Sequence, residues 1–275
     1  MKINTNHLFS IQKPPFLSNC LRFIGRLVPN IKYIRAIPNR ILKPINSLLG
    51  FRGPYIVKID EFYMCLLPEE CVDGNLYFSA HLYDRKEILF LLKRFPKDGV
   101  LIDAGAYKGY WSLKFACRYP NAMIYAIEPN PYVFDVLKFN IKINGYKNIV
   151  PINLGLSDNE EELYLHLNLS GNLGGSTFRE GIIINGDKIK VKVAPLLKII
   201  NEFNIEKIDI LKLDIEGFEP RVLSKFFSQA PKHLYPKYIV LEMHFFSITD
   251  LPYEFQKNYR VVLKGRENWV FQRSS

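Results

Sequence analysis

Two patterns of hydrophobic and polar positions alternate along the chain from residue 97 onward. Short apolar runs rich in β-branched residues are separated by longer segments in which apolar positions recur with helical spacing. The apolar runs predict strands over residues 100–103, 123–127, 149–154, 208–213, 238–243, 259–263 and 269–271. The other segments predict helices over residues 110–119, 131–144, 195–203 and 219–227. This alternation favours an α/β fold, a mostly parallel, seven-stranded Rossmann-like sheet with helices on both faces.

Turn-forming residues mark several boundaries between these elements. Asn130 and Pro131 supply an N-cap and a proline in the first helical turn. Alternating leucines over 163–167 and the run 189–193 predict added strands or a hairpin. The loop 171–177 is rich in glycine and hydroxyl groups, and we expect either a lid over a site or a plain connection there.

Charge separates the N-terminal part of the chain from the rest. The 275-residue chain has a formal net charge of +10, yet residues 1–59 contain ten basic residues and no Asp or Glu, so the remainder is formally neutral. We therefore expect a basic, helical N-terminal extension over 1–52 and a main domain over 53–275. Within that domain, residues 53–96 are predicted to hold a hairpin over 55–67 and a helix over 81–95 that lead into the core. Residues 97–275 are predicted to form the core itself.

The N-terminal extension mixes bulky apolar residues with Arg and Lys, as in FLSNCLRFIGRLVP. Such a segment can pack on the main domain with its basic face in water, lie on an anionic membrane surface, or contact nucleic-acid phosphates, and we favour these in that order. Pro29, Pro38 and Pro44 interrupt it, so no apolar run reaches the ~18 to 20 residues that a spanning helix needs. Prolines and charges around the apolar stretch also argue against a signal peptide.

Four cysteines, at positions 20, 65, 71 and 117, form no Cys-x-x-Cys pair and have no His spacing typical of a zinc site. Cysteine use follows the redox compartment, and these residues are expected to be reduced thiols. The sequence therefore favours a cytoplasmic protein, peripheral to a membrane if the extension docks there.

The stretch LIDAGAYKGYWSL holds the first candidate site. It places Asp103 at the end of an apolar strand and Gly105 and Gly109 in the turn that follows, where glycine lets the backbone pass close to a ligand. A dinucleotide-binding turn would have glycine at the position of Asp103, and an aspartate would repel a diphosphate. The same carboxylate suits a ligand with ammonium and sulfonium charges, which favours S-adenosylmethionine over NAD.

Glu128 ends the second strand, 25 residues after Asp103, where its two oxygens can accept both hydroxyls of a ribose. The turn 156–158 follows the third strand, and we expect polar partners for an adenine edge there. The predicted cofactor contacts are Asp103, Gly105, Ala106, Tyr107, Gly109, Glu128, Pro129, Asn130, Leu156, Ser157, Asp158 and Asp214.

Several stretches resemble the FkbM-type methyltransferase family. The resemblance runs from DAGAYKGYWS through YAIEPNPYVFDVL and KIDILKLDIEGFEPRVL to YIVLEMH, roughly residues 80–245, and its most specific part is KLDIEGFE at 212–219. It implies a class I methyltransferase fold, S-adenosylmethionine as cofactor, and O-methylation, commonly of sugar hydroxyls in glycans, glycolipids or natural products. The sequence departs from the usual pattern at Tyr107 and Lys108, where small polar residues are common.

Methyl transfer from a sulfonium is a direct displacement, so the site must align the acceptor oxygen, and a positioned base commonly contributes about 10²- to 10⁴-fold. The catalytic candidates after the fourth and fifth parallel strands are Lys212, Asp214, Glu216 and His244. In one interpretation, Asp214, Glu242 and His244 hold a divalent cation such as Mg²⁺ that polarises the acceptor. In the other, which we favour, His244 or Asp214 takes the proton and Lys212 stabilises the developing alkoxide.

Two other functions compete with O-methylation of a small molecule or glycan. An RNA ribose 2′-O-methyltransferase would share the cofactor domain and use the basic extension on phosphates, but the main domain shows no obvious aromatic-and-basic patch. A non-catalytic cofactor-binding protein would have lost its cleft carboxylates, whereas Asp214, Glu216 and Glu242 all remain. We therefore expect a glycan or small-molecule substrate and regard nucleic acid as the less favoured partner.

Overall fold

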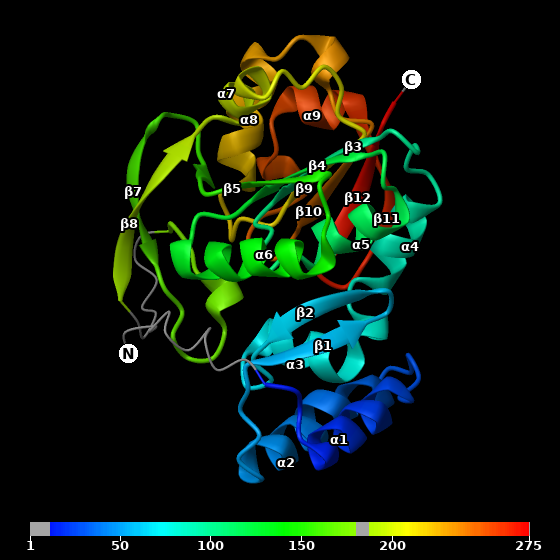
Figure 1. Ribbon diagram of the computed structural model, residues 1–275. Helices are drawn as coiled ribbons and strands as arrows, with labels where there is room; N and C mark the ends of the chain where they lie inside the picture. Colours follow the sequence, from blue (N-terminus) through cyan, green and yellow to red (C-terminus); the bar gives the residue numbers. More distant parts are fainter. Residues whose placement is uncertain (1–11, 180–186, 275) are drawn as a thin grey trace.

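The computed structural model describes residues 12–179 and 187–274 and is built on a central seven-stranded sheet (Figure 1). Its strands are β3 (Val100–Ala104), β4 (Met123–Ile127), β5 (Ile149–Ile152), β9 (Ile210–Leu213), β10 (Tyr238–Glu242), β11 (Tyr259–Lys264) and β12 (Asn268–Arg273). They lie in the order β11-β12-β10-β9-β3-β4-β5. The strands from β10 to β5 are parallel, and β12 pairs antiparallel with both β10 and β11. The expected α/β fold class is confirmed.

Helices cover both faces of this sheet (Figure 1). One face carries α4 (Arg85–Leu92), α5 (Tyr110–Arg118) and α6 (Pro131–Asn144), and the other carries α7 (Leu196–Glu202), α8 (Glu219–Gln229) and α9 (Tyr253–Asn258). Successive residues of a strand point to opposite faces, so Leu101 joins the core that contains Phe115, whereas Ile102 joins the core that contains Phe226 and Phe255. The sheet is thus buried on both sides, which explains its continuous apolar strands.

A layer formed by the preceding part of the chain packs against α5 and α6 (Figure 1). It contains β1 (Tyr55–Ile59), β2 (Phe62–Leu66) and α3 (Cys71–Ser79). The side chain of Asn140 on α6 accepts a hydrogen bond from the Cys65 backbone amide at 2.8 Å. Phe62 and Leu76 belong to the same hydrophobic core as Phe115, so this layer extends the core of the sheet domain.

The sequence pattern does not predict α3. The helix expected over 81–95 is confined to α4 and is preceded by a short 3-10 turn, Ala80–Leu82. The missed helix is buried on several sides and includes the polar Asp73 and the small Gly74 among its buried residues, so it lacks the one-sided apolar periodicity of a surface helix.

A second, three-stranded sheet of order β6-β8-β7 stands beside the main one. Its strands are β6 (Gly155–Leu156), β7 (Glu161–His166) and β8 (Lys188–Ala194). The antiparallel β7–β8 pair confirms the predicted hairpin. The third predicted strand ends at Ile152, before the expected Leu154, because the chain turns there into the second sheet.

The N-terminal extension contains α1 (Phe16–Arg26), the π-helical turn η3 (Pro38–Leu42) and α2 (Lys43–Leu48), and residues 1–11 lie outside the described part. Both α1 and η3 pack on α3. Lys32, Arg35 and Arg40 are exposed, in keeping with a basic face in water, but α1 also turns its apolar side outward, which the sequence pattern does not predict. Within residues 12–179 and 187–274, no helix has the length and apolar character needed to cross a bilayer.

The contact between α1 and α3 depends on Gly25. A Cβ atom at this position would lie 2.4 Å from the backbone oxygen of Phe78. We expect Gly25→Ala to destabilise the protein by about 1–3 kcal/mol through overpacking, and so to lower the thermal midpoint by several degrees. Phe23→Ala is the matched control in the same helix, because Phe23 is 64% exposed. Equal midpoints for the two variants in calorimetry would contradict this packing.

Candidate active site

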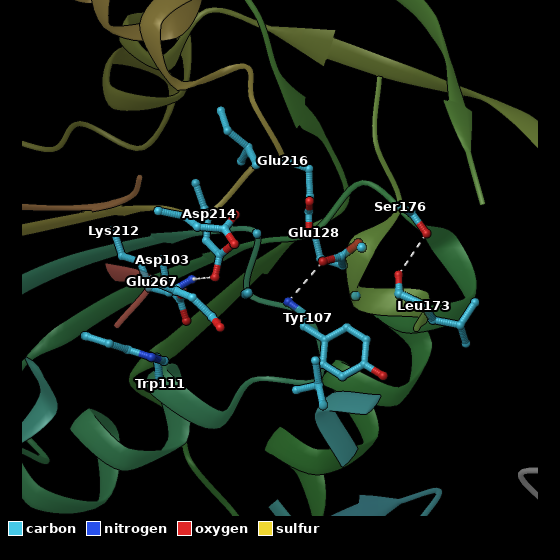
Figure 2. A pocket seen from close by; sticks show the side chains of 18 of the residues that line it. Asp103, Tyr107, Trp111, Glu128, Leu173, Ser176, Lys212, Asp214, Glu216 and Glu267 are labelled. Carbon is cyan, nitrogen blue, oxygen red and sulfur yellow. Dashed lines mark hydrogen bonds and ion pairs between the residues drawn. The ribbon is translucent and has the colours of Figure 1, made fainter. Parts of the chain in front are cut away.

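A cavity of about 580 Å³ lies at the carboxyl ends of β3, β4, β9 and β10 (Figure 2). Parallel α/β sheets commonly place ligands at this edge. The sequence-predicted residues that line it are Asp103, Gly105, Ala106, Tyr107, Glu128, Pro129, Leu156, Lys212, Asp214, Glu216, Glu242 and His244. The structure therefore brings together candidates that lie far apart in the sequence, such as Asp103 and Glu242.

The turn after β3 passes close to the end of β9. Gly105 has φ +73°, and a Cβ atom there would lie 1.8 Å from the backbone oxygen of Asp214, so no side chain fits. The amides of Gly105 and Ala106 both donate to the Ile127 carbonyl, at 3.0 and 2.9 Å. These contacts hold the turn against both neighbouring strands.

A buried ion network joins the ends of β3 and β9. Asp103 and Lys212 are paired in strand register, and the Lys212 Nζ lies 3.6 Å from Asp103 Oδ1 and 3.0 Å from Asp214 Oδ2 (Figure 2). Burial alone would lower the pKa of Lys212, but the attraction of Asp214 and Asp103 raises it above its ordinary value. Burial raises the pKa of Asp103, an effect that Lys212 and a 2.7 Å hydrogen bond from the Ser112 hydroxyl partly offset.

Glu128 follows β4 and is 7% exposed at the cavity wall. Its two oxygens accept the backbone amides of Asn130 at 2.9 Å and Tyr107 at 3.0 Å. Burial raises the pKa of Glu128 to about 7, although these two hydrogen bonds lower it in part. A carboxylate oxygen has two lone-pair directions, so each oxygen retains capacity for a further donor.

Asp214, Glu216 and Glu242 form an acidic group whose oxygens lie within 4.8 Å of one another. Burial, followed by the charge of Asp214, raises the pKa of Glu216 to about 8 and also raises that of Glu242. Glu216 has a left-handed backbone conformation, φ +56°, which is uncommon for a residue with a side chain. His244 lines the cavity but is exposed and is not part of this acidic group, so among the described residues Asp214 and Glu242 are grouped with Glu216 and not, as predicted for a cation, with His244.

Glu219, the last acidic residue of the family signature, has a different position. It is fully buried at the start of α8, and its oxygens accept the backbone amides of Ile215 at 2.8 Å and Gly217 at 2.9 Å. Such hydrogen bonds order the loop between β9 and α8. The role that this geometry supports for Glu219 is to shape the segment that carries Asp214 and Glu216.

Four of the predicted cofactor residues do not line the cavity. Gly109 caps α5 and Asn130 caps α6, where its side chain accepts the Tyr132 amide at 3.1 Å. Ser157 is fully buried, and the Asp158 carboxylate is bonded to the Ser157 hydroxyl and to Arg221. Ser157 and Asp158, predicted as polar partners of an adenine edge, thus stand outside the cavity wall, close to the point where the chain enters the second sheet at 155.

Other residues line the cavity without having been predicted. Those from the sheet side are Tyr83, Asp84, Trp111, Glu267 and Asn268, and those from the outer wall include Asn39, Cys71, Val72, Asn75 and Asn172–Ser176. The Asp84 carboxylate accepts the Trp111 indole N–H at 2.9 Å. Burial raises the pKa of Asp84 to about 6. No local motif marks these positions, because separate elements bring them to the cavity.

The loop expected over 171–177 forms part of the outer wall. The Leu173 amide donates to Glu70 at 3.0 Å, and the Cys71 amide donates to the Gly171 carbonyl at 2.7 Å. Within the loop, the Ser176 hydroxyl donates to the Leu173 carbonyl at 2.8 Å (Figure 2). The loop is thus bonded to the start of α3.

Lys108, one of the two departures from the family pattern, points away from the cavity. It is 3% exposed and forms an ion pair with Asp73 on α3. Asp73 also accepts the Leu67 amide at 2.7 Å, and the Lys108 carbonyl accepts the Asn140 side chain at 2.9 Å. Lys108 therefore joins the turn after β3 to the N-terminal layer.

The cavity is strongly acidic although the whole chain is basic. Seven of the residues that line it are Asp or Glu, and two are Lys or Arg. One of those two cations, Lys212, is buried between carboxylates. A cationic ligand would therefore be attracted to this cavity, and a polyanionic ligand would be repelled.

We expect Lys212→Met to destabilise the protein by about 3–5 kcal/mol, because it would leave Asp103 buried beside a second unpaired carboxylate. Lys207→Met is the matched control. Lys207 pairs with Asp98 at 3.4 Å through side chains that are 51% and 78% exposed, and losing such a pair costs at most about 1 kcal/mol. Urea denaturation of both variants checks this prediction, which fails if their free energies of unfolding agree.

The chain was compared with known families and proteins. The model described as the methyltransferase FkbM domain matches residues 103–264. Methyltransferase sdnD of Sordaria araneosa is 29% identical over 174 residues, which cover 53% of this chain and 64% of the relative. Methyltransferase 1 of Beauveria bassiana (strain ARSEF 2860) is 26% identical over 149 residues, which cover 47% of this chain and 59% of the relative. The match thus spans less than two thirds of either relative's length.

Two further proteins are similar over shorter or more divergent stretches. The tRNA(Phe) (4-demethylwyosine(37)-C(7)) aminocarboxypropyltransferase of Methanocaldococcus jannaschii is 30% identical over 103 residues, which cover 38% of this chain and 39% of that protein. The solved structure of M. jannaschii TYW2 in complex with AdoMet aligns with a TM-score of 0.42 at 17% identity, covering 80% of this chain and 86% of that one. Because the FkbM domain model matches more than half of the chain, the protein belongs to the FkbM methyltransferase family.

Proposed function

We propose that this protein is an S-adenosylmethionine-dependent O-methyltransferase that acts on a hydroxyl of a sugar in a glycan, glycolipid or natural product. The observation that carries the proposal is the acidic cavity at the carboxyl ends of the parallel strands, with Glu128 at its wall. Membership of a methyltransferase family agrees with it.

The residues present fit S-adenosylmethionine. The free lone pairs of Glu128 can accept the ribose hydroxyls, and Gly105 lets the turn after β3 pack directly against the backbone of Asp214 at the cavity wall. Asp103 and Asp214 supply negative charge toward the ammonium and sulfonium groups, although Lys212 offsets part of it. When bound, the cofactor supplies an electrophilic methyl group whose carbon–sulfur bond breaks as the acceptor oxygen takes the carbon.

Glu216 is the base that we assign to the acceptor hydroxyl. It lines the cavity after β9, and burial beside Asp214 raises its pKa, so its carboxylate accepts a proton more strongly than an ordinary glutamate does. Asp214 is less suited to the task because its charge is engaged by Lys212 at 3.0 Å. His244 stands at the exposed edge of the cavity and is the second candidate.

The polar wall supports a sugar as the acceptor. Asn39, Asn75, Asn172 and Asn268 line the cavity, and their amides offer both donors and acceptors to hydroxyl groups. The similarity to a tRNA-modifying enzyme makes RNA the other acceptor to consider. The cavity disfavours a polynucleotide, because acidic side chains outnumber basic ones seven to two and one of the cations, Lys212, is already paired with carboxylates.

A divalent cation is the alternative to a protein base. The oxygens of Asp214, Glu216 and Glu242 lie within 4.8 Å of one another, and carboxylates are the ligands that Mg²⁺ takes. Bound there, a cation would polarise an acceptor hydroxyl. We propose the metal-free route because Glu216 is itself placed to take the proton.

The affinity for S-adenosylmethionine is expected to fall about tenfold between pH 8 and pH 6. The pKa of Glu128 is about 7, and protonation removes the negative charge that attracts the ribose hydroxyls, so the binding-competent fraction drops as pH decreases. Isothermal titration at several pH values measures this. Glu128→Gln is expected to bind more weakly at pH 8 and to lose most of the pH dependence.

Asp158→Asn is the control for that titration. Asp158 is bonded to Arg221 and does not line the cavity, so its substitution is expected to leave the affinity unchanged. A pH-independent affinity in the wild-type protein, or equal effects of the Glu128 and Asp158 substitutions, would contradict the role assigned to Glu128.

Transfer of labelled methyl groups to a panel of glycans tests the reaction itself. We expect transfer to persist with chelator, Glu216→Gln to lower kcat by about 10²- to 10⁴-fold, and His244→Gln to lower it by less than about tenfold. Titration of S-adenosylmethionine to each variant confirms an intact cofactor site. Loss of transfer with chelator would instead favour the cation, and transfer only to RNA would contradict the sugar acceptor.

A further inference from the structure

Helix α1 turns its apolar side away from the protein. Phe16, Phe23 and Leu27 are 81%, 64% and 66% exposed, whereas the residues of this helix that are buried are Ser18 and Gly25. A helix that packs on a soluble domain normally buries its apolar stripe and exposes its polar one. The arrangement in α1 is the reverse.

Polar contacts set this orientation. The Ser18 hydroxyl lies 2.6 Å from Asn46 Oδ1 and 2.7 Å from the Tyr77 hydroxyl, and both contacts are buried. The Arg26 guanidinium donates to the Lys58 carbonyl at 2.8 Å. Rotating α1 to bury its apolar side would break these bonds and would strand Asn46, which is 1% exposed, without its partner.

The exposed apolar side of α1 is part of a larger surface. Eighteen large apolar side chains are exposed across residues 12–179 and 187–274, and twelve of them lie within 16–49. These twelve, which we call the docking face, are Phe16, Leu17, Phe23, Ile24, Leu27, Ile31, Tyr33, Ile34, Ile41, Ile45, Leu48 and Leu49. Soluble monomers rarely gather so many exposed apolar residues in one segment unless that surface binds something.

The charged side chains within the docking-face segment, residues 16–49, are all basic, and acidic side chains approach it from the next layer, Glu69 beside Ser47 and Asp60 near Arg26. Lys32, Arg35 and Arg40 are exposed within the same segment, and the first acidic residue of the chain is Asp60. Apolar side chains interspersed with an excess of cations complement a surface that has an apolar interior and a negatively charged outer layer.

We propose that the docking face binds the surface of a membrane that contains anionic phospholipids. The apolar side chains would enter the boundary between headgroups and acyl chains, and Lys32, Arg35 and Arg40 would contact lipid phosphates. Attachment would be peripheral, since it combines an apolar and an electrostatic contribution without a spanning helix.

Other occupants fit the docking face less well. Nucleic acid would use the cations but would leave twelve large apolar side chains in water. A second copy of the chain would bring two basic segments, each without a carboxylate, against one another. An anionic bilayer satisfies both the apolar and the charged groups.

The segment that carries the docking face also supplies a residue to the wall of the active-site cavity. Asn39 in η3 lines the cavity, and its side chain is hydrogen-bonded to Asn75 of α3. Ile41, two residues further along the same turn, is 49% exposed on the docking face. Figure 1 shows α1 and α2 together at one end of the molecule, away from the sheet helices α7–α9. Docking would therefore use the same segment that supplies Asn39 to the cavity.

Co-sedimentation of the full chain with vesicles tests the proposal. We expect binding to mixed phosphatidylcholine and phosphatidylglycerol vesicles and much weaker binding to phosphatidylcholine alone or at high salt. The apolar variant is Phe16→Ser, Phe23→Ser and Leu27→Ser, and the charge variant is Lys32→Gln, Arg35→Gln and Arg40→Gln. The charge variant should lose about 100-fold in partitioning, at about fivefold per cation, and the apolar variant at least about tenfold.

The control variant replaces exposed aromatic residues outside the docking face. It combines Tyr63→Ser, Tyr164→Ser and Tyr253→Ser, whose side chains are 45%, 51% and 73% exposed. It should bind vesicles as the wild type does. All three variants should keep the wild-type thermal midpoint and affinity for S-adenosylmethionine, which separates failure to dock from failure to fold.

Three outcomes would overturn the proposal. The first is a failure of the vesicle experiment itself: either the wild-type protein does not sediment with anionic vesicles, or the apolar variant binds them as well as the control variant does. Another is salt-sensitive binding to a single-stranded RNA probe that only the charge variant loses, without vesicle binding. The third is a wild-type dimer in light scattering that the apolar variant converts to a monomer, again without vesicle binding.

Discussion

The active site depends on one buried ammonium group held between two strand ends. Lys212 on β9 stands in register with Asp103 on β3 and two positions before Asp214. Burial and the nearby charge of Asp214 both raise the pKa of Asp103, and the ammonium group of Lys212 opposes that rise. Lys212 therefore allows this edge of the sheet to keep negative charge in a place from which water is largely excluded.

Backbone geometry complements that charge. The turn after β3 can approach β9 because Gly105 has no side chain, and it is fixed to β4 by hydrogen bonds to the Ile127 carbonyl. Glu128 is fixed in turn by the amides of Tyr107 and Asn130. The acidic groups are therefore positioned before any ligand arrives, so little of the binding free energy has to be spent on ordering them.

The N-terminal layer is part of the same structure. The Lys108–Asp73 ion pair joins the turn after β3 to α3, and the Glu70–Leu173 hydrogen bond joins the loop of the outer wall to the start of that helix. The same helix supports α1 and η3, whose outward side forms the docking face. The docking face, which we propose binds an anionic membrane, and an acidic cavity with the opposite preference for charge thus share one supporting helix.

The sequence by itself determined the α/β sheet, its flanking helices and most of the carboxylates of the site. Strand and helix periods, and acidic residues at strand ends such as Asp103, Glu128 and Asp214, are local signals, and parallel strands bring their carboxyl ends to one edge. Tertiary structure decided the direction in which individual side chains point. It turned Asp158 toward Arg221, grouped Glu216 with Asp214 and Glu242, and brought Asp84 and Trp111 to the cavity. It also decided that α1 exposes its apolar side, because buried hydrogen bonds from Ser18, which no periodicity encodes, outweigh the usual preference of an amphipathic helix.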